Sequence, residues 1–402
     1  MTSENEGFWE SVNGSQLPYG RQTISTEDIN SVVNVLHSDW LTQGPVTERF
    51  EVEFARRVGA KYAVAVSSAT AALHLSSIVL GMAPGETLWT TPNTFVASAN
   101  CALHCGGSVD FVDIDPSTYN LSVDKLEGKL QSMVKAGMRL PKIVVPVHFA
   151  GQPCDMEQIS ALAEKYRFSV LEDAAHAVGS YYRGNPVGDC HYSDMTVFSF
   201  HPVKIMTTGE GGMITTNNLE HYNRLIDLRS HGITRNPERF QFRSKGPWYY
   251  EQQELGSHYR MTDIQAALGL SQLNSLDKFI ARREEVASSY DQLLAGSSFR
   301  LPVRDPKFKS SWHLYVARIE DEKKGNHHEF FQRVKACGVG IQLHYLPVHL
   351  HPFYRDLGFK EGDFPGAEKH ANTAFSLPIF PTLKDSDIEK VAKILLDSIC
   401  GL

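Results

Sequence analysis

Lys204 is the residue of this sequence whose position best suits a nucleophile. It follows the apolar run 195–200 and precedes the glycine-rich turn 208–212. Partial burial or cationic neighbours would lower the pKa of this amine, which would make it nucleophilic and able to form an imine with a carbonyl compound. The alternative is an exposed loop lysine, because most lysines lie on the surface.

Two further polar side chains follow another apolar run. Residues 168–172 are predicted to form a strand, and Asp173 and His176 come just after it. A carboxylate in this place is costly to bury alone, so Asp173 requires a cation or a donor, and a protonated heteroaromatic nitrogen would serve. His176 could point into the same crevice. The alternative is an aspartate that caps the next helix beside a hydrogen-bonded histidine.

A third candidate lies at a strand-to-helix turn, where Ser68 and Thr70 follow the apolar run 62–66. Free backbone N–H groups and the helix dipole favour an anion there, and the two hydroxyls add donors. The alternative is an ordinary helix cap, for which Ser and Thr are preferred. The 17 histidines include no HExxH motif and no cysteine-rich ligand set, so no metal site is expected.

The first two thirds of the chain alternate short apolar runs with helical patterns. The runs lie at 62–66, 87–91, 109–114, 142–149, 168–172, 195–200 and 212–216. Strands that are apolar on both faces and joined by helices indicate an α/β fold with a largely parallel sheet between helices. Such a sheet binds its ligand at the strand ends, where Ser68, Asp173 and Lys204 fall.

The last third of the chain has the pattern of a smaller α+β domain. Helical patterns at 264–276 and 282–294 lead to a strand-like run at 314–319, and an amphipathic helix is predicted over 387–398. The preceding segment 233–254 is rich in Arg, Pro, Gly and aromatic residues and lacks periodicity, which is typical of a functional loop.

Composition limits the classes of function. The 402 residues carry 39 basic and 46 acidic side chains, a net charge of −7, which argues against nucleic-acid binding. No uncharged apolar run approaches the roughly 18 residues of a membrane span. Residues 1–10 are polar and acidic, unlike a secretory signal, and the six cysteines form no CxxC pair. We therefore expect a cytoplasmic protein with reduced thiols.

Taken in order, these segments resemble the sugar-nucleotide aminotransferases of the DegT type, which are pyridoxal-phosphate enzymes. The resemblance runs from about residue 17 to 381, and its pieces are 67–74, 92–95, 146–151, 172–177, 199–204 and 208–212. It implies the aspartate-aminotransferase-like fold, fold type I of the pyridoxal-phosphate enzymes. The expected parts are an N-terminal arm at 1–24, a large domain at 25–262 with a mainly parallel seven-stranded sheet, and a small α+β domain at 263–402.

The resemblance also implies roles for single residues around the cofactor ring. Lys204 stands where the family's lysine forms an imine with pyridoxal phosphate. Asp173 stands where a carboxylate pairs with the pyridinium nitrogen and keeps the ring able to accept electrons. His176 stands where the family contacts the ring hydroxyl, and Phe95 stands where a planar side chain stacks on the ring.

The cofactor phosphate is assigned by the same resemblance to Thr70 and Ser199, with the backbone N–H of Ala71 at the helix start. Where this chain has His258, the family usually has an asparagine whose side chain reaches across a dimer to the cofactor phosphate of the other subunit. A histidine can still donate a hydrogen bond there. The resemblance therefore implies a homodimer with shared active sites, to which the segment 233–254 contributes.

The implied reaction is a transamination in two half-reactions. By family habit L-glutamate supplies the amino group and a keto-sugar nucleotide receives it, with Lys204 as the general base and acid. Related sugar dehydratases have a histidine in place of this lysine, so Lys204 favours transamination. Arg229 is a candidate for binding the glutamate carboxylate, and a surface ion pair is the alternative.

A narrower resemblance concerns the sugar. Segments 38–45, 201–204 and 247–251 look like those of transaminases on the route to pseudaminic acid. The implied acceptor is a UDP-linked 4-keto-6-deoxy-N-acetylhexosamine, aminated at C4, and the aromatic residues at 247–250 would suit uracil or sugar faces. The alternatives are a hydrophobic interface loop at 247–250, a GDP- or dTDP-linked keto sugar, and a regulatory homologue without turnover.

Overall fold

The computed structural model describes residues 16–320 and 327–400. Segment 1–10, in which no secretory signal is expected, and residues 1–15 of the predicted N-terminal arm lie outside the described residues. Within the described part, no helix is both long enough and apolar enough to cross a membrane.

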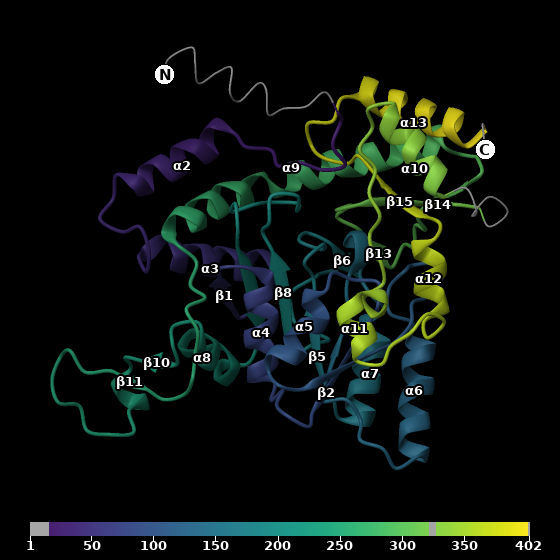
Figure 1. Cartoon of the computed structure of the whole chain (residues 1–402). Coiled ribbons are helices and arrows are strands. Elements are labelled where there is room, and N and C mark those ends of the chain that lie inside the picture. The colour runs from purple at the N-terminus through teal and green to yellow at the C-terminus, as the bar shows by residue number, and fades with distance from the viewer. Residues whose placement is uncertain (1–15, 321–326, 401–402) are drawn as a thin grey trace.

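A seven-stranded sheet with the order β1–β9–β8–β5–β4–β2–β3 forms the centre of the molecule (Figure 1). Its strands are β1 (Tyr62–Val66), β2 (Thr87–Thr90), β3 (Ser108–Phe111), β4 (Ile143–Val145), β5 (Ser169–Asp173), β8 (Met195–Ser199) and β9 (Gly212–Thr216). Of these seven, β9 alone runs against its neighbours β1 and β8, and the other pairs are parallel. The predicted mainly parallel sheet is therefore confirmed.

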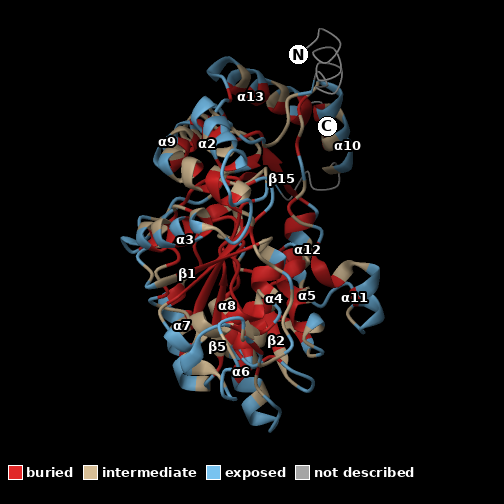
Figure 2. Cartoon of the chain, turned by 90° about the vertical axis from the view of Figure 1, so that its left-hand side faces the viewer, coloured by how far each residue is buried: buried red, intermediate tan, exposed pale blue. Residues whose placement is uncertain are grey.

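Helices cover both faces of this sheet. One face carries α4 (Ala69–Val79), α5 (Ala97–His104) and α8 (Leu219–Leu228), and the other carries α3 (Pro45–Val58), α6 (Val123–Lys135), α7 (Met156–Tyr166) and α9 (Asp263–Leu293). Successive strand residues point to opposite faces, so Val64 and Val66 pack with α4 while Ala63 and Ala65 pack with α3. Figure 2 shows buried residues, in red, both in the strands of the sheet and in the helices beside it.

The last third of the chain contains a second core, next to the described C-terminus. A three-stranded antiparallel sheet packs with two helices there, namely β12 (Phe299–Arg300), β14 (Tyr315–Ile319), β15 (Ala374–Leu377), α10 (His327–Ala336) and α13 (Asp385–Cys400). The two helices expected at 264–276 and 282–294 are one helix, α9, because residues 277–281 contain neither Gly nor Pro to end the first. The division into domains after residues 24 and 262 stays a prediction.

The segment 233–254 forms a hairpin that projects from the body of the molecule (Figure 1). Its two short strands are β10 (Ile233–Thr234) and β11 (Glu251–Gln252). The remaining α-helices and strands are α2 (Thr26–Leu36), α11 (Pro352–Asp356), α12 (Pro365–Ala371) and a small sheet of β6 (Tyr181–Tyr182), β7 (Asn185–Pro186) and β13 (Phe308–Lys309). Three short 3-10 helices lie at Phe149–Gly151, Pro237–Arg239 and Val348–Leu350.

Candidate active site

A pocket of about 460 Å³ opens where β5 and β8 end. Its lining includes six of the eight residues predicted for the site, namely Thr70, Phe95, Asp173, His176, Ser199 and Lys204. Among the described residues, Ala71 and His258 do not line this pocket. The parallel strands thus bring the predicted amine, carboxylate and anion site to one edge of the sheet.

The start of helix α4 lines one end of the pocket with backbone donors that suit an anion. Ser68 caps the helix, and its Oγ accepts the backbone N–H of Ala71 at 3.1 Å. The N–H groups of Ala69 and Thr70 have no acceptor in the described chain, and a helix supplies none for its first turn. A Cβ at Gly212 would lie 2.6 Å from Ser68, so only glycine lets β9 come this close. The free donors are therefore those of Ala69 and Thr70, whereas the N–H predicted from Ala71 is already donated to the cap.

Asp173 ends strand β5 with its side chain only 5% exposed. One carboxylate oxygen accepts the hydroxyl of Ser98 at 2.6 Å, and the other accepts the backbone N–H of Ala175 at 3.0 Å. Each oxygen keeps a lone pair that a ligand donor can use. Ser98 was not predicted, because a serine on helix α5 carries no sequence signal apart from its position three residues after Phe95.

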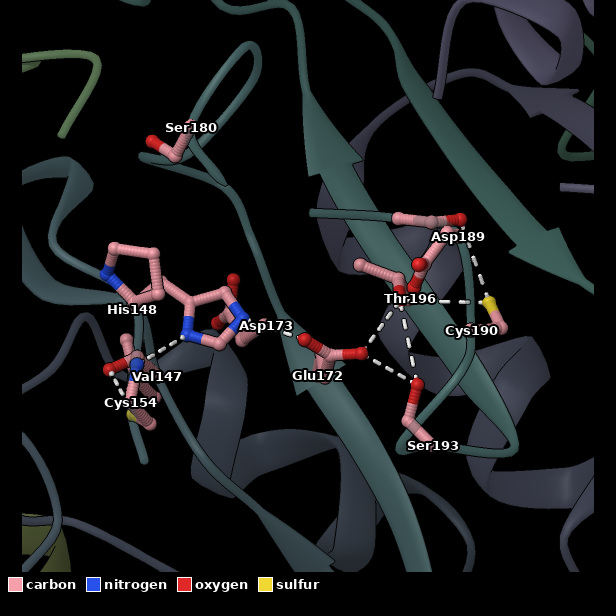
Figure 3. A network of polar contacts seen from close by, with 12 residues as sticks. Val147, His148, Cys154, Glu172, Asp173, Ser180, Asp189, Cys190, Ser193 and Thr196 are labelled. Carbon is pink, nitrogen blue, oxygen red and sulfur yellow. Dashed lines mark hydrogen bonds and ion pairs between the residues drawn. The ribbon is translucent and has the colours of Figure 1, made fainter. Parts of the chain in front are cut away.

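A buried polar network lies next to Asp173 at the end of β5 (Figure 3). Glu172 points to the other face of β5, where it accepts hydrogen bonds from His148 Nε2 at 2.7 Å, from Thr196 at 3.0 Å and from Ser193. His148 also donates its backbone N–H to the carbonyl of Asp173 at 3.1 Å. Burial alone would raise the pKa of Glu172, but these hydrogen bonds outweigh burial and hold the pKa below its usual value.

We expect Glu172→Ala to lower the free energy of unfolding by about 3 kcal/mol, because it leaves the N–H of His148 and two hydroxyls buried without an acceptor. Chemical denaturation of the cofactor-free chain measures the loss. Glu172→Gln is the matched control, since its amide has the same size, can accept the N–H of His148 and can still hydrogen-bond a hydroxyl. Its free energy of unfolding should fall by only about 1 kcal/mol. An alanine variant as stable as the native chain would contradict this role.

Lys204 lies in the turn between β8 and β9 and lines the pocket together with Asp173. Burial lowers the pKa of the amine to about 8, and the negative charge of Asp173 opposes this shift without cancelling it. A substantial fraction of the amine is therefore neutral near pH 8, as nucleophilic and proton-transfer chemistry requires.

His176 is buried beside the amine with both ring nitrogens engaged. Its Nδ1 accepts the backbone N–H of Ala150 at 3.2 Å, so the ring proton belongs on Nε2, which lies 3.0 Å from the hydroxyl of Tyr345. Burial, followed by the charges of Lys204 and His344, lowers the pKa of His176 well below its ordinary value. The histidine is therefore a neutral donor that faces the pocket.

Several lining residues were not found from the sequence. Three segments that are distant in sequence supply Tyr19, His313, Gln342, His344 and Tyr345 to the lining, whereas the predicted Phe95 is 59% exposed at the rim. The sequence signal that could have found His344 and Tyr345 is their place in the mainly apolar segment 339–348.

Arg229 does not reach the pocket, which corrects its candidacy for the glutamate carboxylate. Its guanidinium bonds the Glu51 carboxylate, and it donates to the carbonyl of Ala65 at 2.7 Å. The alternative of a surface ion pair is also wrong, because both partners are largely buried. Arg229 therefore forms a buried structural ion pair with Glu51.

A second hollow of about 720 Å³ lies between α2, α3 and α9. Its lining is dominated by exposed polar side chains such as Arg49, Arg56 and Asn274, and it contains neither Lys204 nor Asp173. The chemistry-bearing residues therefore place the active site in the smaller pocket.

Comparison with known proteins agrees with this geometry. The profile of the DegT/DnrJ/EryC1/StrS aminotransferase family matches residues 22–396. The spore coat polysaccharide biosynthesis protein SpsC of Bacillus subtilis is 40% identical over 391 residues, which cover 96% of this chain and 97% of that protein.

Solved structures are similar over nearly the whole chain. A Streptococcus pneumoniae protein described as a sugar aminotransferase, solved in its PLP form, superposes with a TM-score of 0.88 at 29% identity, covering 96% of this chain and 99% of that one. Helicobacter pylori PseC, an aminotransferase involved in the biosynthesis of pseudoaminic acid, gives a TM-score of 0.88 at 30% identity, covering 96% and 100%.

Proposed function

Because the chain belongs to the DegT/DnrJ/EryC1/StrS aminotransferase family, we propose that it moves an amino group from L-glutamate to C4 of a UDP-linked 4-keto-6-deoxy-N-acetylhexosamine. Family membership makes it a pyridoxal-phosphate-dependent sugar aminotransferase, whose substrates are a nucleotide-linked sugar and an amino donor. The finer identity of the sugar is supported by the likeness to PseC and by the segments 38–45 and 247–251.

The observation that carries the proposal is one pocket with three complementary groups. This pocket is lined by Lys204, whose pKa is lowered, by the buried carboxylate of Asp173 and by the free N–H groups at the start of α4. An amine, a carboxylate and an anion site fit the aldehyde, ring nitrogen and phosphate of pyridoxal phosphate. When bound, this cofactor supplies an electron-accepting ring that stabilises negative charge at the carbon next to the substrate nitrogen.

The surrounding side chains orient the reactants. Asp173, fixed by Ser98 and Ala175, would accept a hydrogen bond from the protonated ring nitrogen. The N–H groups of Ala69 and Thr70, with the hydroxyls of Thr70 and Ser199, would hold the phosphate.

Two further groups act on the ring itself. Nε2–H of His176 would turn from the Tyr345 hydroxyl to the ring hydroxyl, and Phe95 would cover the ring at the pocket rim. Both therefore restrict the orientation of the ring in the pocket.

Lys204 performs the proton transfers. Its neutral amine takes the proton from the α-carbon of the amino donor and returns it on the other side of the reacting C–N unit. In the second half-reaction the same amine acts in the reverse direction at C4 of the sugar.

We expect uptake of pyridoxal phosphate by the cofactor-free chain to accelerate as the pH rises through about 8. Only the neutral amine attacks a carbonyl group, and burial lowers the pKa of Lys204 from 10.5 to about 8, so the neutral form predominates above pH 8. Stopped-flow absorbance measures the rate, and Lys204→Arg should show no covalent uptake at any pH. A rate that climbs only near pH 10.5 would contradict a lowered pKa.

The proposed assembly is a homodimer in which His258 serves the partner's cofactor phosphate. His258 lies outside the pocket of its own chain, next to His231 at a ring distance of 5.7 Å. Seven large apolar side chains on and beside α2 and α3 are exposed, namely Ile24, Ile29, Val33, Leu36, Trp40, Leu41 and Val52. Such a surface suits a subunit contact. Sedimentation that finds a fully active monomer would contradict the dimer.

Substrate assays test the proposed function directly. The purified holoenzyme is given L-glutamate and UDP-, GDP- or dTDP-linked 4-keto-6-deoxy sugars in parallel, and 2-oxoglutarate release is followed. The UDP-linked N-acetylhexosamine should give the highest kcat/KM. Preference for a GDP- or dTDP-linked sugar would assign the chain to another branch of the family.

A further inference from the structure

His313 is a buried histidine of the pocket wall that no step above uses. Its side chain is only 3% exposed, yet it lines the pocket with Lys204 and His176. Neither ring nitrogen has a hydrogen-bond partner among the described residues, and of the two only Nδ1 is sealed from solvent. Buried polar groups are nearly always hydrogen-bonded, so this ring is missing a partner.

The backbone, and not the ring, holds His313 in place. The buried guanidinium of Arg283 donates to the carbonyls of Trp312 and His313 at 3.1 and 3.3 Å. On either side, the Ser311 hydroxyl donates to the carbonyl of His176 at 3.1 Å, and the Leu314 N–H donates to Ala150 at 3.3 Å. The ring therefore has a fixed position against His176, with ring centroids 4.3 Å apart, and its nitrogens remain available.

The state of the ring follows from its surroundings. Burial, followed by the neighbouring His176, Lys204 and Arg283, lowers the pKa of His313 well below its ordinary value, so the ring is neutral. A buried N–H without an acceptor is rarer than an unused lone pair, which places the proton on Nε2. Nε2, the nitrogen that is not sealed, then presents a donor to the pocket.

The pocket also needs such a donor. No arginine occurs among its described lining residues, and its one ammonium group is the reacting amine of Lys204. The oxygen atoms of a substrate must therefore be bound in this chain's pocket by neutral donors, and the Nε2–H of His313 is such a donor, with no acceptor among the described residues.

We propose that His313 is a substrate-binding residue whose Nε2–H donates a hydrogen bond to an oxygen atom of the substrate held at Lys204. The inference rests on the proposed function, since it requires both substrates to enter this pocket. The acceptor is either a carboxylate oxygen of the amino acid or an oxygen of the sugar, and the two half-reactions separate these sources.

The test compares His313→Phe, which keeps a flat ring without a donor, with His313→Gln, whose amide N–H can replace Nε2–H. Each half-reaction is run alone, with L-glutamate or with the 4-amino-sugar nucleotide in reverse. We expect His313→Phe to raise the KM of one substrate about tenfold or more and His313→Gln to recover most of the loss. The Kd of pyridoxal phosphate should stay unchanged. A shift with glutamate identifies the carboxylate, and a shift with the amino sugar identifies the sugar oxygen.

Four results would overturn the inference. Unchanged KM values for both substrates in His313→Phe would exclude the hydrogen bond, and a His313→Gln variant as impaired as His313→Phe would indicate packing alone. Should the Phe variant not fold, native crystals soaked with each substrate decide, since Nε2 must lie within about 3.2 Å of a substrate oxygen. A native enzyme that converts neither substrate would overturn the proposed function as well, whereas the other results overturn His313 alone.

Discussion

Replacing Lys204 with alanine should reduce turnover by about 10⁴-fold or more and abolish covalent capture of the cofactor. The alanine removes both the only amine in the described pocket lining and the group that moves the substrate proton. Single-turnover kinetics with L-glutamate measures the first effect. Borohydride reduction followed by peptide mass analysis measures the second, because only the native chain should carry the cofactor on the peptide that contains residue 204.

Lys204→Arg is the matched control for this prediction. It keeps the positive charge, but a guanidinium stays protonated and is neither a nucleophile nor a base. It should therefore bind the cofactor's phosphate yet be as inactive as Lys204→Ala. An alanine variant that retains the native absorbance and the covalent label would show that another group anchors the cofactor.

Replacing Asp173 with asparagine should lower kcat by about 10³-fold while the fold is retained. The amide can keep the hydrogen bonds with Ser98 and Ala175, but it no longer carries the negative charge that keeps the ring nitrogen protonated. Without that proton the ring accepts electrons poorly, so the loss falls on the proton-transfer step. Stopped-flow measurement of the glutamate half-reaction reports it, and circular dichroism checks the fold.

Ser98→Ala separates charge from orientation. It removes one of the two hydrogen bonds to Asp173 and leaves the carboxylate ionised, so we expect a loss of only about tenfold. If Asp173→Asn were no worse than Ser98→Ala, the carboxylate would act by position and not by charge.

Much of the site could be predicted because the fold brings strand ends together. Asp173 and Lys204 each follow an apolar run, and parallel strands carry their carboxyl ends to a common edge. The aspartate-aminotransferase-like fold that the resemblance implied is confirmed by the structural neighbours and by the central sheet. Both predictions rest on local patterns and on their order along the chain.

The rest depends on tertiary packing that leaves no periodic signal. Tyr19 and His313 each line the pocket without their neighbours in sequence, and Tyr345 lines it together with residues 342–344 from the last part of the chain. Arg229 was misjudged because its partner Glu51 lies on a helix 178 residues away, and no local pattern reveals that pairing. At the start of α4, the Ser68 hydroxyl competes for the N–H of Ala71, which sequence alone does not show.

The reversal of strand β9 makes the lysine-bearing turn suitable for grafting. Ser199 pairs with Gly212 across the antiparallel strands β8 and β9, so the segment 200–211 begins and ends at neighbouring points. Parallel neighbours would need a crossover of about a dozen residues or more, usually with a helix. The segment can therefore be exchanged between related chains as one continuous cassette, whereas transplanting the Asp173 side would require several separate insertions.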